Sequence, residues 1–331
     1  MAELIEKGDI YFFYRPKVNK EKIASIDDMQ RFYLVLVPDG EEIGRLFIVG
    51  KKRLPEIVKG ESRSKTRQWM MNELTDKPEK IGEEFKPVRY KTKTRGRQVQ
   101  GESIPIGEGR YALFEREGST RLGYRLNRPS KPGKAQNELG ILQEASFVIS
   151  VRNPEVKVRG FPESEPRYPK KLQKKFTDKR WIDVDDPKLL NYESAQMVLI
   201  GAHDSLEKAD VKITGKPNLF KKLGLKSADW PTDALEKGKF AKPQLEVEAR
   251  SPEGDRSKGG RRGGAKAVKT GSAAGIARSL KGVDFPKDHD GLVEYAKSHD
   301  APDEVVEVLE ELPKGPFRNM AEVQRAVGEV R

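Results

Sequence analysis

The sequence predicts an α+β protein, with a body built on a mixed, mainly antiparallel sheet and a small all-α domain of four helices. Short apolar runs of strand length recur in the first half of the chain and are separated by turn residues. Spacing typical of helices is confined to a few stretches before residue 250 and becomes general after residue 276. The charge divides in the same way, because residues 1–250 carry 50 Lys and Arg against 38 Asp and Glu, and residues 272–331 carry 8 against 12. We therefore predict a basic body at 1–250 and an acidic helical domain at 272–331.

Two β-hairpins are predicted in the body. Apolar residues 32–37 and 46–49 are joined through Pro, Asp and Gly at 38–40, which is a turn signal. Residues 111–116 and 120–126 form the second hairpin, because Glu, Gly and Ser lie between them. Further strands are predicted at 10–14, 147–151 and 197–200.

Helical pieces of the body are fewer. They are predicted at residues 65–74, 169–176, 218–223 and 232–235. In the first of them Trp69, Met70 and Leu74 are available for burial. Because of long proline-rich stretches, the order of the strands in the sheet cannot be predicted from the sequence. A division of the body into two subdomains near residues 130–145 is left open.

Residues 251–271 are predicted to be a flexible basic linker. Large apolar side chains are almost absent, since Val268 is the one aliphatic residue larger than alanine, and such a segment cannot offset the entropy of ordering its backbone. Arg261 and Arg262 lie between glycines, a mixture typical of proteins that bind RNA or single strands without sequence preference. A tether with no binding role is the alternative.

The C-terminal domain has clear helix signals. Apolar stripes predict four helices, which begin at Ile276, after Asp288, after Pro302 and at Asn319. In the last helix the Asn319 side chain is expected to cap the amide of Glu322, while Glu322 reaches back toward the start of the helix.

Three strings in this domain carry a family resemblance. They are LKGVDFP at 280–286, LVEYAKSHDAPDEVVEVLEELP at 292–313 and NMAEVQRAV at 319–327. Residues 276–331 thus resemble a small bacterial helical domain of unknown function, family 2795 of the domains of unknown function. The resemblance implies a helical fold and brings no activity. The body, with FFYRP and RFYLVLVP, is similar to hypothetical bacterial sequences and gains no chemistry from that similarity.

Five cations on alternate positions form the first candidate site. They are Arg89, Lys91, Lys93, Arg95 and Arg97. In one continuous strand this spacing places all five on one face, about 6.5 to 7 Å apart, where they can meet successive phosphates. An exposed strand edge that charge protects from aggregation is the alternative.

A lysine-rich helix and one arm of the second hairpin supply further cations. Lys170, Lys171, Lys174 and Lys175 recur at helical spacing. Leu172 and Phe176 lie four residues apart on another face, where they can dock the helix. An ordinary amphipathic surface helix is the alternative. Arg121 and Arg125 alternate with apolar residues in the hairpin arm, so we add them to the predicted cationic surface.

Catalysis has little support in this sequence. The chain has no cysteine, which excludes disulfides, thiolate nucleophiles and cysteine-based metal sites and fits a reducing compartment. The three histidines, His203, His289 and His299, lack metal-ligand spacing, and we predict no catalytic residue, no metal site and no cofactor. A cluster of carboxylates in WIDVDDPK could hold Mg²⁺ for phosphodiester cleavage, or serve as turn and cap residues; it comprises Asp183, Asp185 and Asp186.

The sequence therefore favours a cytoplasmic nucleic-acid-associated binding protein of low sequence specificity over an enzyme. A net charge of +12 makes RNA or DNA the first partner to consider, and the acidic domain is expected to dock a protein partner or to fold back on the body. No secretion signal and no apolar run of membrane-spanning length is present, so no membrane partner is predicted. An adaptor for acidic proteins is the second hypothesis, and a metal-dependent nuclease is the third.

Overall fold

A computed structural model describes residues 2–58, 64–92, 96–158, 161, 166–209, 211–243, 276, 279–280, 282–299, 301 and 303–329. The chain divides into two compact units, Met1–Lys258 and Gly259–Arg331. The predicted linker at 251–271 lies outside the described residues, so its assignment and the domain limits drawn from it stay a prediction.

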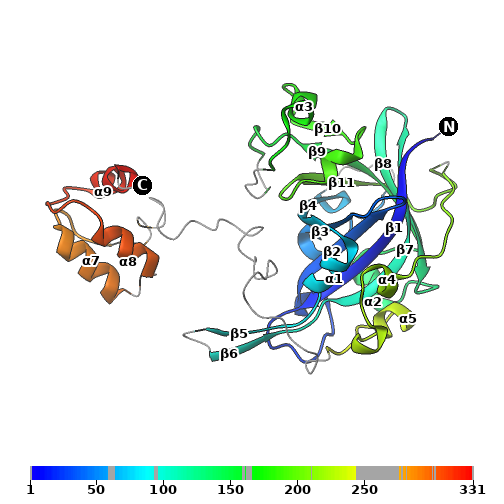
Figure 1. The fold of residues 1–331 in the computed structure, drawn as a ribbon, viewed down its shortest axis with the longest axis horizontal. Coiled ribbons are helices and arrows are strands. Elements are labelled where there is room, and N and C mark those ends of the chain that lie inside the picture. The colour runs from blue at the N-terminus through cyan, green and yellow to red at the C-terminus, as the bar shows by residue number, and fades with distance from the viewer. Residues whose placement is uncertain are drawn as a thin grey trace. The chain divides into compact units, whose positions relative to one another are not determined.

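The first unit is built around a closed barrel of eight antiparallel strands (Figure 1). The strands are β1 (Glu3–Pro16), β2 (Met29–Pro38), β3 (Gly44–Val49), β4 (Arg67–Asp76), β7 (Ile104–Arg116), β8 (Ser119–Arg128), β9 (Glu144–Arg152) and β11 (Gln196–His203). Strands β1 to β4 follow one another around one half, and β7, β8, β9 and β11 make the other half. Pairing of β1 with β7 and of β4 with β11 closes the barrel. A short strand, β10 (Trp181–Asp183), pairs with the end of β9.

The prediction of an α+β body with a mixed sheet is therefore wrong. Each pairing between described barrel strands is antiparallel, and the helices are short elements on the outside of the barrel or at its ends. Residues 65–74, predicted as a helix, instead belong mostly to strand β4. Met70 and Met71 are both buried, because the barrel wall is covered on two faces here, and this removes the alternation that marks a half-exposed strand. The barrel also runs across residues 130–145, since β8 pairs with β9.

Apolar side chains fill the barrel and also cover part of its outer wall. Inside, the Phe12 ring lies 6.2 Å from Phe32 and 5.2 Å from Tyr124. On the outer face, Phe13 stacks on Phe85 at 4.0 Å, in a second cluster formed with residues of the flanking helices. Alternate residues of β1 thus contact two different cores, which explains why the second half of this strand is buried without interruption.

Helices complete the first unit. They are α1 (Pro78–Glu84), α2 (Lys134–Glu138), α3 (Lys170–Gln173), α4 (Leu219–Lys222) and α5 (Asp233–Lys237), with the 3-10 turns η1 (Ile26–Asp28), η2 (Gly50–Lys52), η3 (Ser64–Thr66), η4 (Lys174–Phe176), η5 (Pro187–Leu190) and η6 (Ser227–Asp229). The predicted helices at 169–176, 218–223 and 232–235 are confirmed as α3 with η4, α4 and α5. Both predicted hairpins are confirmed as β2–β3 and β7–β8.

Strands β5 (Val88–Thr92) and β6 (Gly96–Gln100) form a separate two-stranded sheet, here called the ribbon. Figure 1 shows the ribbon extending away from the barrel. It has no pairing with the barrel strands in the described part of the chain.

The second unit contains three described helices, α7 (His289–Ser298), α8 (Asp303–Glu310) and α9 (Met320–Glu329). Their apolar faces meet in one core that includes Leu292, Leu309 and Val323. Asn319 accepts a hydrogen bond from the Glu322 amide at 3.1 Å, as predicted. The predicted four-helix domain is not shown, because the described residues of this unit form three helices and the helix predicted from Ile276 lies largely outside the described residues.

Candidate nucleic-acid interface

The ribbon is fixed to the body at its base. Asn19 lies in the loop after β1 and forms two hydrogen bonds with Val99, both at 2.9 Å. The backbone N–H of Asn19 donates to the Val99 carbonyl, and Oδ1 of Asn19 accepts from the backbone N–H of Val99. Gln100 donates its side-chain amide to the Pro16 carbonyl at 2.5 Å. Val88 lies opposite Gln100 in the register, and both are buried. The base of the ribbon is therefore held to the body by the buried residues Val88 and Gln100 together with the surface hydrogen bonds of Asn19.

The register of the ribbon corrects the predicted spacing of its cations. Residues 89–97 do not form one continuous strand, because they are divided between β5 and β6. In the hairpin, Arg89 lies opposite Val99 and Lys91 lies opposite Arg97. Directly opposite positions of an antiparallel pair belong to the same face, so three of the five predicted positions still share a face. The other two, Lys93 and Arg95, lie outside the described residues.

The two arginines of β8 are occupied by carboxylates. Arg121 is buried, and its Nη2 donates to Oε2 of Glu117 at 2.6 Å. Arg125 is more exposed, and its Nε lies 3.5 Å from Oε1 of Glu144. Sequence spacing alone could not reveal the Glu144 contact, because that residue comes from the neighbouring strand β9.

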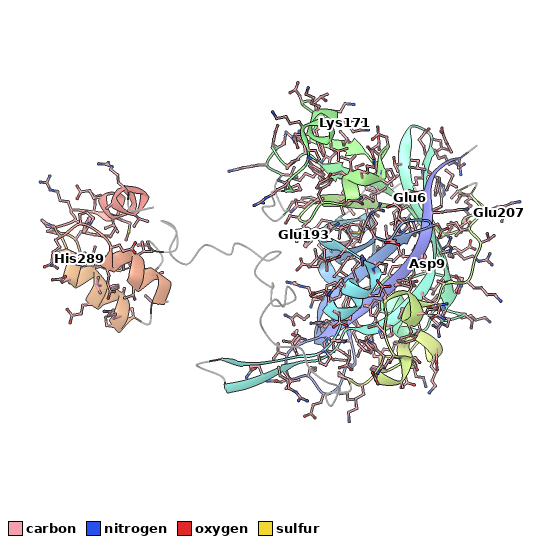
Figure 2. All side chains as sticks on the ribbon, in the orientation of Figure 1. Glu6, Asp9, Lys171, Glu193, Glu207 and His289 are labelled. Atoms are coloured by element: carbon pink, nitrogen blue, oxygen red, sulfur yellow. The ribbon has the colours of Figure 1, made fainter. Side chains whose placement is uncertain are left out.

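The lysine helix keeps most of its charge exposed. Leu172 and Phe176 are buried in the main core, as predicted, so α3 and η4 dock through this face. Lys170, Lys171 and Lys174 are exposed and form no ion pair within the described part of the chain. Figure 2 places Lys171 at the outer surface of this region.

Lys175 differs from the other three lysines of this helix. Its Nζ lies 3.0 Å from Asp185 and 4.0 Å from Asp186. Asp186 also caps η5 by accepting from the Lys188 amide at 3.0 Å. These carboxylates therefore serve an ion pair and a cap, and among the described residues no group of three His, Asp or Glu side chains is arranged to hold a metal ion.

Those predicted cations that the structure describes do not meet in one continuous patch. Figure 1 shows α3 and the ribbon at opposite ends of the first unit, and the β8 arginines belong to the barrel wall between pairing strands. Arg261 and Arg262 lie outside the described residues. Two separate groups of cationic positions remain, one on the ribbon and one on α3 and η4.

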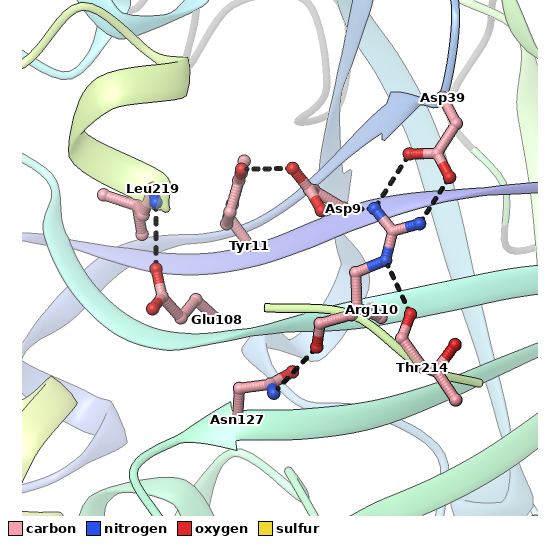
Figure 3. Close-up of polar contacts among 9 residues, drawn as sticks. Asp9, Tyr11, Asp39, Glu108, Arg110, Asn127, Thr214 and Leu219 are labelled. Carbon is pink, nitrogen blue, oxygen red and sulfur yellow. Dashed lines mark hydrogen bonds and ion pairs between the residues drawn. The ribbon is translucent and has the colours of Figure 1, made fainter. Parts of the chain in front are cut away.

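A polar network on the barrel wall was missed by the sequence analysis (Figure 3). Arg110 on β7 forms ion pairs with Asp9 on β1, where Nη1 lies 2.6 Å from Oδ1, and with Asp39 in the β2–β3 turn. Its Nε donates a hydrogen bond to the Thr214 carbonyl at 3.3 Å. The hydrogen bond from Arg110 holds the pKa of Asp39 below its usual value. Burial raises the pKa of Tyr11, whose hydroxyl donates to Asp9 at 3.0 Å. The arrangement joins separate segments of the chain and places the Arg110 guanidinium between two carboxylates.

The histidines show no catalytic arrangement in the described part of the chain. Burial lowers the pKa of His203, and the neighbouring Arg121 and Arg116 lower it further. Nδ1 of His289 lies 2.8 Å from Oδ1 of Asp290. The ring of His299 stacks on the ring of Tyr295, with 4.0 Å between the ring centroids.

No described helix is both long enough and apolar enough to pass through a lipid bilayer.

Comparison with known proteins identifies a family in the second unit. Residues 271–324 match the model of a family described as a protein of unknown function, DUF2795, in agreement with the resemblance seen in the sequence. No curated protein and no solved structure matches the chain.

Proposed function

We propose that the protein binds nucleic acid with little sequence preference and that the ribbon carries the main contact. One observation supports this most strongly. From Val88 to Gln100 the chain has five Lys and Arg and no Asp or Glu, and this run forms a ribbon separate from the barrel sheet. Each cation that neutralises a phosphate releases condensed counterions, which drives association without reading the base sequence.

The like charges of the ribbon support the same proposal. Lys91 and Arg97 occupy directly opposite positions, an arrangement that destabilises a sheet by up to about 1 kcal/mol. A two-stranded sheet alone is only marginally stable in water. A bound polyanion would remove this repulsion, whereas protection of a strand edge requires no run of cations free of carboxylates.

The exposed lysines of α3 and η4 form a second contact in this proposal. Lys170, Lys171 and Lys174 are free of ion pairs in the described structure, so they can meet phosphates without first losing a partner. Arg121 and Arg125 are left out, because their carboxylate partners would have to be displaced.

A cytoplasmic location belongs to the proposal, because a chain of 331 residues without cysteine fits a reducing compartment. The second unit, with its acidic balance, is proposed to dock a protein partner or to compete with nucleic acid for the basic body.

Fluorescence anisotropy with labelled DNA and RNA at about 50 and 200 mM salt tests the proposal. The five ribbon cations alone predict a slope of log affinity against log salt near −4.5, or roughly a 500-fold loss between these two concentrations, and each contact made by α3 and η4 should steepen the slope by about 0.9. The variant Lys91→Gln with Arg97→Gln should flatten the slope by about 2. The matched control, Lys216→Gln with Lys226→Gln, removes two exposed lysines elsewhere on the body and should leave the slope within error.

Absence of binding at the lower salt concentration would end the proposal. The second hypothesis, an adaptor for acidic proteins, then predicts that partners captured from a lysate remain after nuclease treatment. Partners held through nucleic acid would be lost on the same treatment.

A further inference from the structure

We propose that the ribbon enters the major groove of double-stranded DNA. This inference rests on the proposed function, and it adds the class of nucleic acid and the place of contact. It follows from the backbone of the ribbon, from its separation from the barrel and from the composition of its two strands.

The dimensions of the ribbon suit a DNA groove. Strands β5 and β6 each contain five residues, which at about 3.4 Å per residue gives a length of roughly 17 Å. Two paired strands lie about 4.8 Å apart. The major groove of B-form DNA is about 12 Å wide and 8.5 Å deep, and it admits a two-stranded ribbon. The minor groove, about 6 Å wide, does not admit a ribbon of this kind without deformation of the duplex.

The attachment of the ribbon leaves its outer part available. The contacts with the body lie at one end, where the buried residues Val88 and Gln100 pair and Asn19 bonds to Val99 at the surface. Arg89, the next position of β5, is already exposed. The opposite pair Lys91 and Arg97 lies further from the base, so the cationic positions occupy the part of the ribbon beyond its anchored end.

The composition of the ribbon argues against a single strand as the preferred ligand. Proteins that bind single strands without sequence preference use aromatic side chains on which successive bases stack. Between Val88 and Gln100 the chain has one aromatic residue, Tyr90. A row of cations with a single aromatic residue matches the two phosphate backbones that border a groove better than a path of unstacked bases.

The shape of the groove separates DNA from RNA. The major groove of an A-form RNA duplex is deep and narrow, and protein side chains do not reach into it. A two-stranded ribbon held to the body at its base therefore fits B-form DNA and is excluded from the major groove of duplex RNA. The contacts available to Lys and Arg are mainly to phosphates, so the preference concerns the form of the helix more than its sequence.

A competition experiment tests this inference. Labelled DNA duplex bound to the full-length protein is displaced with unlabelled DNA duplex, RNA duplex and single-stranded DNA of the same sequence. We expect the DNA duplex to compete at least about tenfold better than the other two, and we expect bound protein to protect guanine N7, a major-groove atom, from methylation. Lys91→Gln with Arg97→Gln should lose both the preference and the protection, and Lys216→Gln with Lys226→Gln should keep both.

The possible failures are distinguishable. Binding of nucleic acid without preference for the DNA duplex, or without protection of N7, overturns the groove contact and leaves the proposed function standing. Loss of preference in the control variant as well as in the ribbon variant also overturns it. Absence of binding by each of the three ligands removes the proposed function itself. Circular dichroism of each variant verifies that the barrel remains folded.

Discussion

Arg45 and Glu6 form a bidentate ion pair within the barrel, with Nη1 to Oε1 at 2.7 Å and Nη2 to Oε2 at 2.8 Å. Arg45 is 1% exposed, and its Nε donates to Oδ1 of Asn191 at 2.6 Å. The Tyr111 hydroxyl donates to the same Glu6 carboxylate at 2.6 Å. The pair thus joins β1 to β3 across the intervening strand β2, with its polar atoms engaged on several sides.

Replacement of Arg45 by methionine should destabilise the barrel strongly. Glu6 would be left with a buried and unpaired charge, and breaking a buried pair in this way costs about 3–5 kcal/mol. Urea unfolding followed by tryptophan fluorescence measures the change, because Trp69, Trp181 and Trp230 all belong to the first unit. The matched variant Arg53→Met loses an exposed pair with Glu56 at 3.1 Å and should change stability by less than about 1 kcal/mol. Equal losses in the two variants would contradict a special role of the buried pair.

Asp39→Asn should alter how stability depends on pH. The hydrogen bond from Arg110 lowers the pKa of Asp39 in the folded protein. A carboxyl of this kind stabilises the fold above its unfolded pKa, about 3.9, and this contribution is lost as pH falls through the lower folded value. The difference between wild type and variant should therefore be largest near neutral pH and shrink below about pH 4. Asp39 is 40% exposed, so the difference should stay under about 1 kcal/mol in urea unfolding. A difference that is constant with pH would refute the pairing as its cause.

Removal of the α3 lysines should weaken nucleic-acid binding independently of the ribbon. The variant in which three lysines are changed to glutamine should have a flatter slope of log affinity against log salt, by about 0.9 for each phosphate contact that is lost. The three lysines are Lys170, Lys171 and Lys174. Because α3 and the ribbon lie at opposite ends of the unit, the changes in binding free energy should add in a variant that carries both sets. Anisotropy of the single-set and combined variants measures this. A combined loss no larger than that of one set would mean that the two groups do not act as separate contacts.

Deletion of residues 272–331 tests whether the second unit competes with nucleic acid. The segment carries 8 Lys and Arg against 12 Asp and Glu, so as a tethered polyanion it should reduce binding to the basic body. We expect the truncated chain to bind roughly threefold more tightly at low salt, and the gain should vanish at high salt through screening. Unchanged affinity in an anisotropy titration would favour a docking role for this unit.

Local features of the fold were predictable from the sequence, whereas closure of the barrel was not. Asn218 caps α4 by accepting from the Lys221 amide at 3.1 Å, and the turn at 38–40 joins β2 to β3. These are signals between near neighbours in the chain. Closure depends on the pairings β1–β7 and β4–β11, which join distant segments. Burial of both faces of β4 also concealed its alternation, so the segment with Trp69 was predicted as a helix.

The candidate site was also predictable only in its local features. The sequence reveals each cation and its spacing, but a neutralising carboxylate often comes from another part of the chain. Glu144 reaches Arg125 from the neighbouring strand, and Asp185 reaches Lys175 from beyond strand β10. For the ribbon, the sequence shows directly that no Asp or Glu lies between Val88 and Gln100. The even spacing of the cations concealed that this run divides into two paired strands, β5 and β6.

The salt dependence of DNA binding by a neutral ribbon tests the central claim most directly. In this variant the five cations are changed to glutamine; they are Arg89, Lys91, Lys93, Arg95 and Arg97. The wild-type slope of log affinity against log salt should be near −4.5 or steeper, and the variant should lose most of it, with a circular dichroism spectrum like that of the wild type. A variant that binds DNA with the wild-type affinity and slope would show that the ribbon makes no contact with phosphate.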